Sequence, residues 1–132
     1  MSEEENKKMM LHIFSELSKG NDEPFIEAME DEIQWHWMGT GHLSKSFKGK
    51  SSVLNELWSS VKTTITQPYT VVPHRFFADG DYVVVEHTGH NTTTGGIKYN
   101  NKYCWVILIK AGKIHELNEY MDTELVTQIF KS

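Results

Sequence analysis

The chain has 132 residues, the usual size of one domain, so we expect a single domain with one hydrophobic core spanning residues 1–132 rather than two modules. Its net charge is −5, and no Lys or Arg stripe suggests a nucleic-acid partner. Neither a signal peptide nor an apolar run of the ~20 residues that span a bilayer is apparent, so we expect a soluble cytoplasmic protein without a membrane partner.

The first half of the chain predicts helices around one strand. Apolar residues recur every three or four positions over residues 7–19, which indicates an amphipathic helix. Asp22 is a candidate N-cap for a second, short helix that carries a proline near its start. Residues 32–37, EIQWHW, alternate between apolar and polar and predict a strand, and residues 51–60 predict a further helix.

The second half is rich in β-branched and aromatic residues. Residues 69–90 and 99–121 each contain two such runs, joined by the turns ADGD and KAGK, and they predict two antiparallel hairpins. Asp122 is a plausible N-cap for a closing helix. The order of elements predicts an α+β fold in which helices cover one face of a curved sheet.

Four segments carry a resemblance to a known family: KGNDEPFIEAMEDEIQW, FKGKSSVLNEL, FADGDYVVVE and KAGKIHELNEYMDTELV. Together they resemble the NTF2-like superfamily, specifically its SnoaL-like, ketosteroid-isomerase-related branch, over nearly the whole chain. The resemblance implies a cone-shaped fold, with a strongly bent, mostly antiparallel sheet wrapped around N-terminal helices. It also implies an apolar cavity inside the cone and a homodimer formed through the outer sheet face.

Strand side chains alternate in direction, so one fixed position in each strand determines which others face the cone. By analogy with the family, the inward set is Ile33, Trp35, Trp37, Val83, Val85, His87, Gly89, Asn101, Tyr103, Trp105, Leu117, Glu119 and Met121. A slip of one residue would replace members of this set by their neighbours His36, Glu86, Asn118 and Tyr120.

The inward set predicts a site for acid–base chemistry. Glu119 and His87 are the candidate catalytic residues, because burial raises the pKa of a carboxyl group toward neutrality and a nearby imidazole can share its proton. Tyr103 and Trp105 could donate hydrogen bonds to an oxygen that gains charge. With Trp35, Trp37, Asn101 and Met121 they form the predicted binding site for a small apolar or aromatic molecule.

Comparison with enzymes of the family leaves the reaction open. Phe14 stands where the steroid isomerases have a tyrosine, and Trp105 stands near the position of their protonated Asp. The His and Asp of the polyketide cyclases have His87 and Glu119 as nearest counterparts. The resemblance therefore implies cofactor-independent proton transfer of isomerase, cyclase or dehydratase type.

Two further features bear on function. His87 and His90 lie three residues apart on a predicted strand, hence on opposite faces, so we expect no metal site and no cofactor. If the four tryptophans fill the cone, the alternative is a non-catalytic ligand-binding or protein-interaction module of the same fold.

Overall fold

A six-stranded, bent sheet forms the centre of the fold in the computed structural model, which describes residues 2–130. The strand order is β2-β1-β6-β5-β4-β3, and all neighbours are antiparallel except β1 and β6. The strands are β1 (Met29–Trp37), β2 (Ser46–Lys48), β3 (Val71–Asp79), β4 (Tyr82–Gly89), β5 (Lys102–Lys110) and β6 (Lys113–Met121). The predicted α+β class and mostly antiparallel sheet are therefore confirmed.

The first helix, α1 (Glu3–Leu17), begins four residues earlier than the apolar periodicity predicts. Ser2 and Glu5 form a capping box: the Glu5 backbone N–H donates to Ser2 Oγ (3.1 Å), and the Ser2 backbone N–H donates to Glu5 Oε1 (3.0 Å). Satisfied amide groups extend the helix into a turn without apolar residues. The buried face of α1, which includes Ile13 and Phe14, packs against β3 and β4.

The second helix, α2 (Glu23–Ala28), is short as predicted and ends at Ala28, because β1 begins at Met29. Asp22 precedes it but makes no side-chain capping bond. Its carboxylate instead accepts a hydrogen bond from Trp58 Nε1 (2.6 Å) and pairs with Lys62 Nζ (3.3 Å). Asp22, the predicted N-cap, thus links α2 to the next helical segment through these two contacts.

The next helical segment is continuous and has three parts, whereas sequence periodicity predicts a single helix here. It consists of α3 (Lys50–Ser52), a π-helical stretch η1 (Val53–Trp58) and α4 (Ser59–Thr64). A π-helical turn adds residues relative to an α-helix and thereby shifts the buried face. Val53, Leu57, Trp58 and Val61 are buried along it.

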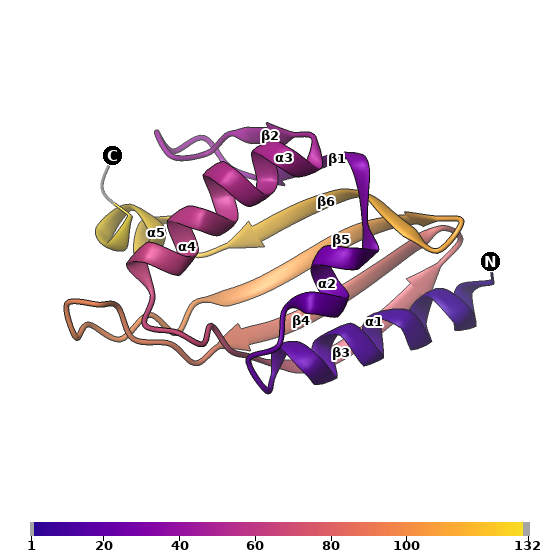
Figure 1. Cartoon of the computed structure of the whole chain (residues 1–132), viewed down its shortest axis with the longest axis horizontal. Helices are drawn as coiled ribbons and strands as arrows, with labels where there is room; N and C mark the ends of the chain where they lie inside the picture. The colour runs from indigo at the N-terminus through magenta and orange to yellow at the C-terminus, as the bar shows by residue number, and fades with distance from the viewer. Residues whose placement is uncertain (1, 131–132) are drawn as a thin grey trace.

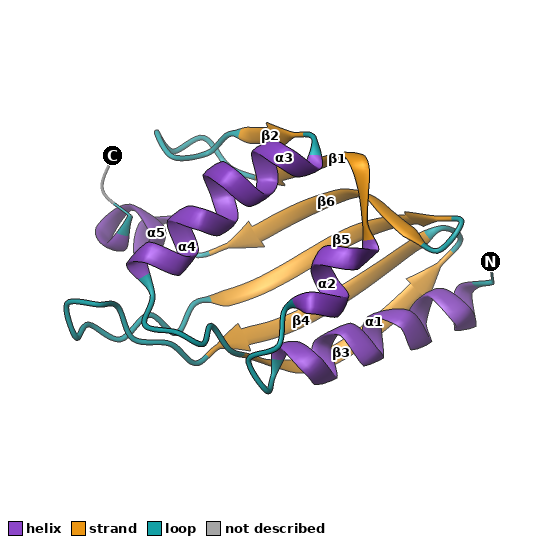
Figure 2. Cartoon of the chain, in the orientation of Figure 1, coloured by secondary structure: helices purple, strands orange, loops and turns teal. Residues whose placement is uncertain are grey.

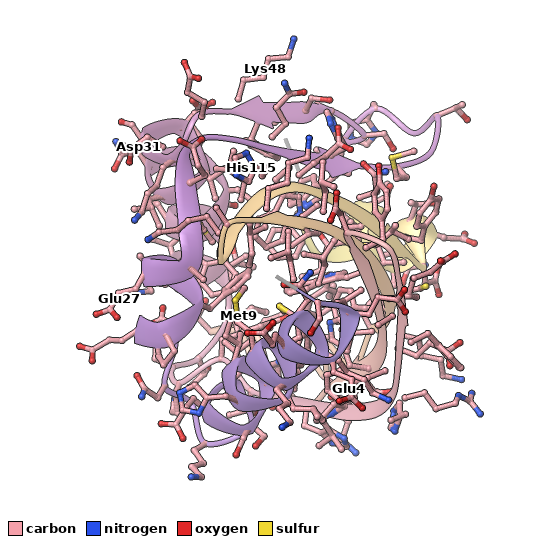
Figure 3. All side chains as sticks on the ribbon, turned by 90° about the vertical axis from the view of Figure 1, so that its right-hand side faces the viewer. Glu4, Met9, Glu27, Asp31, Lys48 and His115 are labelled. Atoms are coloured by element: carbon pink, nitrogen blue, oxygen red, sulfur yellow. The ribbon has the colours of Figure 1, made fainter. Side chains whose placement is uncertain are left out.

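The helices lie on the same face of the sheet, as Figures 1 and 2 show, and α5 (Thr123–Ile129) lies at the end of the sheet where β6 finishes. Viewed from the opposite end, the sheet bends around α1, with Met9 pointing toward the interior and Glu27 and Asp31 pointing outward (Figure 3). Asp122 caps α5 as predicted, its Oδ1 accepting from the amides of Glu124 (3.1 Å) and Leu125 (3.2 Å).

The strand register agrees with the predicted inward set. Along β1 and the two hairpins, β3–β4 and β5–β6, every expected inward residue is buried except Trp37 and Met121, which are half-buried at the ends of β1 and β6. The neighbours that a one-residue slip would bring inside lie outside, and Tyr120 is 45% exposed. Among residues 2–130 no helix is long and apolar enough to cross a membrane.

Candidate functional site

A small pocket opens at the end of the sheet where the carboxyl ends of β1 and β6 meet α4, α5 and the loop before β5. Its cavity volume is about 20 Å³, which is the space of one or two water molecules. Eight of its thirteen lining residues are aromatic. The lining residues are Trp35, Trp37, Leu57, Trp58, Val61, Tyr69, Tyr99, Tyr103, Trp105, Glu119, Met121, Val126 and Phe130. All four tryptophans of the chain thus meet at this pocket.

Glu119 supplies the carboxyl group of the pocket and is 5% exposed. Trp35 Nε1 donates to its Oε1 (3.0 Å), and Trp105 Nε1 donates to its Oε2 (2.8 Å). Burial raises the pKa of Glu119 from 4.5 to about 7, although hydrogen bonds from the indoles of Trp105, Trp35 and Trp37 act in the opposite direction. The carboxyl group can therefore either accept or donate a proton near neutral pH.

Three phenols line the pocket beside the carboxyl group: Tyr69, Tyr99 and Tyr103. Burial raises the pKa of each, to about 12 for Tyr99 and further for the other two. The negative charge of Glu119 also raises all three pKa values. The three hydroxyls therefore stay protonated and can act as hydrogen-bond donors.

His87 does not pair with Glu119, contrary to the sequence-based expectation, and it lies outside the pocket lining. On β4 it faces Tyr103 of β5, whereas Glu119 of β6 faces Trp105, so strand β5 lies between the two side chains. Strands are about 4.8 Å apart, and the pair is separated by two such steps. The indole of Trp105 occupies the space between them, 4.5 Å from the His87 ring by centroids.

The imidazole of His87 sits in an apolar aromatic environment. It stacks on Tyr103 (centroids 4.9 Å apart) and meets the edge of Phe14 (4.7 Å). Its Nδ1 lies 3.2 Å from the Val85 carbonyl, so Nδ1 carries the proton, and Nε2 has no hydrogen-bond partner within residues 2–130. Burial lowers the pKa of His87 from 6.5 to about 3, which keeps the ring neutral.

Asn101 is buried but also lies outside the pocket lining. Its Oδ1 accepts from the backbone amides of Asp122 (3.0 Å) and Lys102 (2.7 Å). Its Nδ2 donates to the Asp122 carbonyl (3.3 Å) and to the Tyr99 hydroxyl (3.2 Å). Asn101 therefore fixes the junction between β6 and α5 and the position of Tyr99, instead of contacting the pocket itself.

The mouth of the pocket is formed by half-buried side chains. Trp37 packs edge-on against Phe47 (centroids 5.3 Å apart) and tilted against Phe130 (6.3 Å), and Phe130 also contacts Tyr99 (5.4 Å). On the other side of Trp37 and Phe130 lies an open hollow of about 430 Å³ with Leu43 and other rim residues. These two rings are therefore the wall between the small inner pocket and a much larger outer hollow.

Sequence reasoning missed three of the pocket's aromatic residues outside the strands. Tyr69 precedes β3, Tyr99 lies in the loop before β5, and Phe130 follows α5. Alternation identifies inward residues only within a strand, so loop residues have no such signal. Trp58 was predicted only as part of a helix face; its contacts with Tyr69 (5.6 Å) and Trp35 (6.1 Å) place it in the pocket wall.

Other ionisable groups do not add a metal site to this picture. Among the described residues, no three His, Cys, Asp or Glu side chains come together as metal ligands. His87 is buried, whereas His90 is exposed one residue after the end of β4.

Solved structures similar to this one share its whole architecture at low sequence identity. An NTF2-like protein of unknown function from Burkholderia pseudomallei has a TM-score of 0.79 at 18% identity, with 100% of both chains covered. A putative SnoaL-like polyketide cyclase from Jannaschia sp. has 0.76 at 16% identity, covering 98% of this chain and 94% of that one. TerC, crystallised with polyporic acid, has 0.75 at 19% identity, covering 96% and 98%.

Sequence comparison identifies the family directly. No curated protein matches the chain significantly. The model of the SnoaL-like domain matches residues 11–117, which extend from α1 through Leu117 on β6. The chain therefore belongs to the SnoaL-like domain family, within the NTF2-like fold.

Proposed function

We propose that the pocket binds a small, mostly apolar or aromatic molecule and that Glu119 transfers a proton to or from it without a cofactor. The observation that carries the proposal is a buried carboxyl group on the wall of an aromatic pocket, with its pKa near 7. Such a group is half-ionised near neutral pH, which suits a general acid or base. Isomerisation, cyclisation and dehydration all need such a group.

Each residue of the pocket has a distinct proposed role. Glu119 moves the proton, and the hydroxyls of Tyr103 and Tyr69 can donate to an oxygen of the ligand that gains negative charge. The side chains of Trp35, Trp37, Trp105 and Met121 contact the ligand's apolar surface. Because His87 is neutral and separated from Glu119 by Trp105, the proposal gives it no part in proton transfer.

Two relatives support a ligand of this class. One is a putative SnoaL-like polyketide cyclase, and the other, TerC, was crystallised with polyporic acid. The inner pocket, at about 20 Å³, is too small for a molecule of more than a few atoms. A larger ligand requires Trp37 and Phe130 to swing aside, which would join the pocket to the outer hollow of about 430 Å³.

A generic probe of buried bases tests the proposal without knowledge of the natural substrate. In 5-nitrobenzisoxazole, a base removes the C3 proton, the C–H electron pair forms a nitrile, and the N–O bond breaks to release a coloured phenolate. We expect turnover to rise with pH through about 7, as Glu119 ionises. We expect Glu119→Gln to reduce kcat/KM by at least about 100-fold.

The matched control is Glu116→Gln, which removes a carboxylate from the outer face of the same strand, where Glu116 lies 3.3 Å from His36 Nε2. This variant should turn over the probe like the wild type. The comparison is repeated in a Trp37→Ala background, in which the pocket opens into the outer hollow and admits the probe without ring movement. Equal rates for the Glu119 and Glu116 variants in both backgrounds would remove Glu119 from the mechanism.

The small cavity favours a second candidate, a ligand-binding or protein-interaction module without catalysis. Four indoles leave only about 20 Å³ in the cone, and a packed aromatic core also explains their position. Because every tryptophan lines the pocket, intrinsic fluorescence reports directly on its occupancy. A fluorescence response without turnover would favour ligand binding; no response to a broad panel of small aromatic and terpenoid compounds would favour protein interaction.

We also propose that two copies pair through the outer sheet face. That face exposes three large side chains on β3, β4 and β6: Phe77 (54% exposed), Tyr82 (42%) and Tyr120 (45%). Exposed aromatic residues gathered on one face are typical of protein interfaces. Light scattering should give about twice the chain mass of 15.3 kDa, and the double variant Phe77→Ser, Tyr120→Ser should halve it. A wild-type mass of one chain would contradict the pairing.

A further inference from the structure

The charges around the pocket have one sign. Within residues 2–130, Glu119 is the only acidic or basic side chain of the lining, since its other polar residues are tyrosines that burial keeps neutral. His87, behind Trp105, is also neutral. Lys62 is paired with Asp22, whose carboxylate also accepts a hydrogen bond from Trp58. Among the described residues, the lining therefore offers a negative charge or none, and none of them neutralises an anion.

The rest of the lining suits a positive charge. Eight of the thirteen residues present aromatic rings, four of them indoles, which have the strongest attraction for cations. An ammonium group surrounded by aromatic rings gains this attraction most when water is excluded. The half-buried Trp37 at the mouth and the buried Trp35 and Trp105 deeper inside make such an enclosure.

We infer that the ligand of this pocket carries a compact ammonium group, held by the Glu119 carboxylate and the surrounding aromatic rings. The inference rests on the proposed binding function and narrows its ligand to apolar amines and methylated ammonium compounds. It does not depend on the proposed proton transfer.

Hydrogen bonds already in place prepare Glu119 for this role. A buried ion pair is favourable only when the remaining polar atoms of both partners are satisfied. Trp35 and Trp105 each donate to a different oxygen of Glu119, so the carboxylate is held in position and partly stabilised before a ligand arrives. A carboxylate has about four acceptor positions, so at least one remains for a cation beside the indole N–H groups.

The pH dependence of binding distinguishes an ammonium ligand from a neutral carbonyl compound. A neutral carbonyl compound would accept a hydrogen bond from protonated Glu119 and would bind better below pH 7, whereas an ammonium group binds the ionised form and prefers higher pH. The ionisable groups that line the pocket beside Glu119 are Tyr69 before β3, Tyr99 in the loop and Tyr103 on β5. His87 on β4 lies behind Trp105, and the Asp122 carboxylate accepts from the first amides of α5. The tyrosines and His87 stay neutral between pH 6 and 8, so Glu119 dominates the titration.

Three molecules of nearly the same shape test the inference: choline, which is a cation at every pH, neutral 3,3-dimethylbutan-1-ol, and the anion 3,3-dimethylbutanoate. Titrations by calorimetry and by tryptophan fluorescence at pH 8 should show choline binding at least about tenfold more tightly than the alcohol. The anion should bind most weakly. Choline should bind about tenfold more weakly at pH 6 than at pH 8, because Glu119 takes up a proton.

Two variants distinguish the contribution of the Glu119 carboxylate to choline binding from the contribution of apolar packing. Glu119→Gln should remove both the preference for choline over the alcohol and its pH dependence, while Glu116→Gln should retain both. Three results would overturn the inference. Choline and the alcohol could bind with equal affinity, or the alcohol or the anion could bind more tightly than choline. Choline could also fail to bind both the wild type and Trp37→Ala. Absence of probe turnover in the wild type and in Trp37→Ala, together with a choline preference that depends on Glu119, would instead overturn only the proposed proton transfer.

Discussion

Acidification from pH 7 to pH 4.5 is expected to destabilise Glu119→Gln relative to the wild type by up to about 3 kcal/mol. Burial raises the pKa of Glu119 from 4.5 to about 7, so the folded wild type takes up a proton as the pH falls below 7. The unfolded chain takes up this proton only near pH 4.5. As the pH falls from 7 to 4.5, protonation of Glu119 therefore adds at most about 1.4 kcal/mol per pH unit to the free energy of unfolding. This contribution is absent above pH 7.

The glutamine variant cannot take up this proton. It also has one acceptor oxygen where Glu119 has two, so the N–H of either Trp35 or Trp105 is left unpaired, at a cost of about 1–3 kcal/mol at every pH. This cost does not depend on pH. The titration of Glu119 is therefore measured by how the difference in unfolding free energy between wild type and variant changes with pH, and not by its size at one pH. Urea unfolding at intervals from pH 4.5 to 8, with Glu116→Gln as the control, measures it. A wild-type-to-variant difference that is the same at both ends would place the pKa of Glu119 near its ordinary value.

The parts of this fold that sequence could predict are those governed by local periodicity. The turn KAGK closes the β5–β6 hairpin, with Ala111 and Gly112 both at positive φ (51° and 72°), as a two-residue turn of matching twist requires. Analogy with the family fixed which face of each strand lies inside, and alternation then placed Glu119 and Trp105 on that face, where both are buried. Strand β2 was missed because its three residues, Ser46–Lys48, are too few for a periodic pattern.

Contacts across the sheet could not be predicted in the same way. Two residues that both face inward, such as His87 and Glu119, contact each other only if their strands are neighbours and their positions are opposite. Here β5 separates them, and Trp105 takes the place that His87 was expected to fill as the partner of Glu119. The cavity volume could not be predicted from sequence either. It depends on the rotamers of Trp37, Trp58 and Phe130, which come from distant parts of the chain.

His87→Phe is expected to show the opposite pH response to the Glu119 variant. Burial lowers the pKa of His87 from 6.5 to about 3, so below pH 6.5 the unfolded chain binds a proton that the folded protein does not. The stability that depends on this neutral ring is present above pH 6.5 and falls by at most about 1.4 kcal/mol per pH unit as the pH drops toward 3. Relative to pH 7, the variant at pH 4 should therefore be more stable than the wild type by about 3 kcal/mol.

The environment of His87 makes the aromatic replacement feasible. Phe14, Tyr103 and Trp105 surround the ring at centroid distances of 4.7, 4.9 and 4.5 Å, and Nε2 has no partner among residues 2–130 to lose. His87→Leu, which has a smaller side chain, guards against overpacking because it should give the same pH response. His42→Gln, at an exposed position, is the control and should follow the wild type.

Between pH 4.5 and 6.5 the contributions of Glu119 and His87 nearly cancel in the wild type, so the two groups together add little pH dependence in this window unless one of them is removed. Chemical shifts of the His87 ring nitrogens provide an independent reading. They should stay those of a neutral ring with the proton on Nδ1 down to pH 5, because the Val85 carbonyl accepts that proton. A ring that titrates near pH 6.5, or a His87→Phe curve parallel to the wild type, would show that His87 is hydrated and would return it as a candidate proton carrier for Glu119.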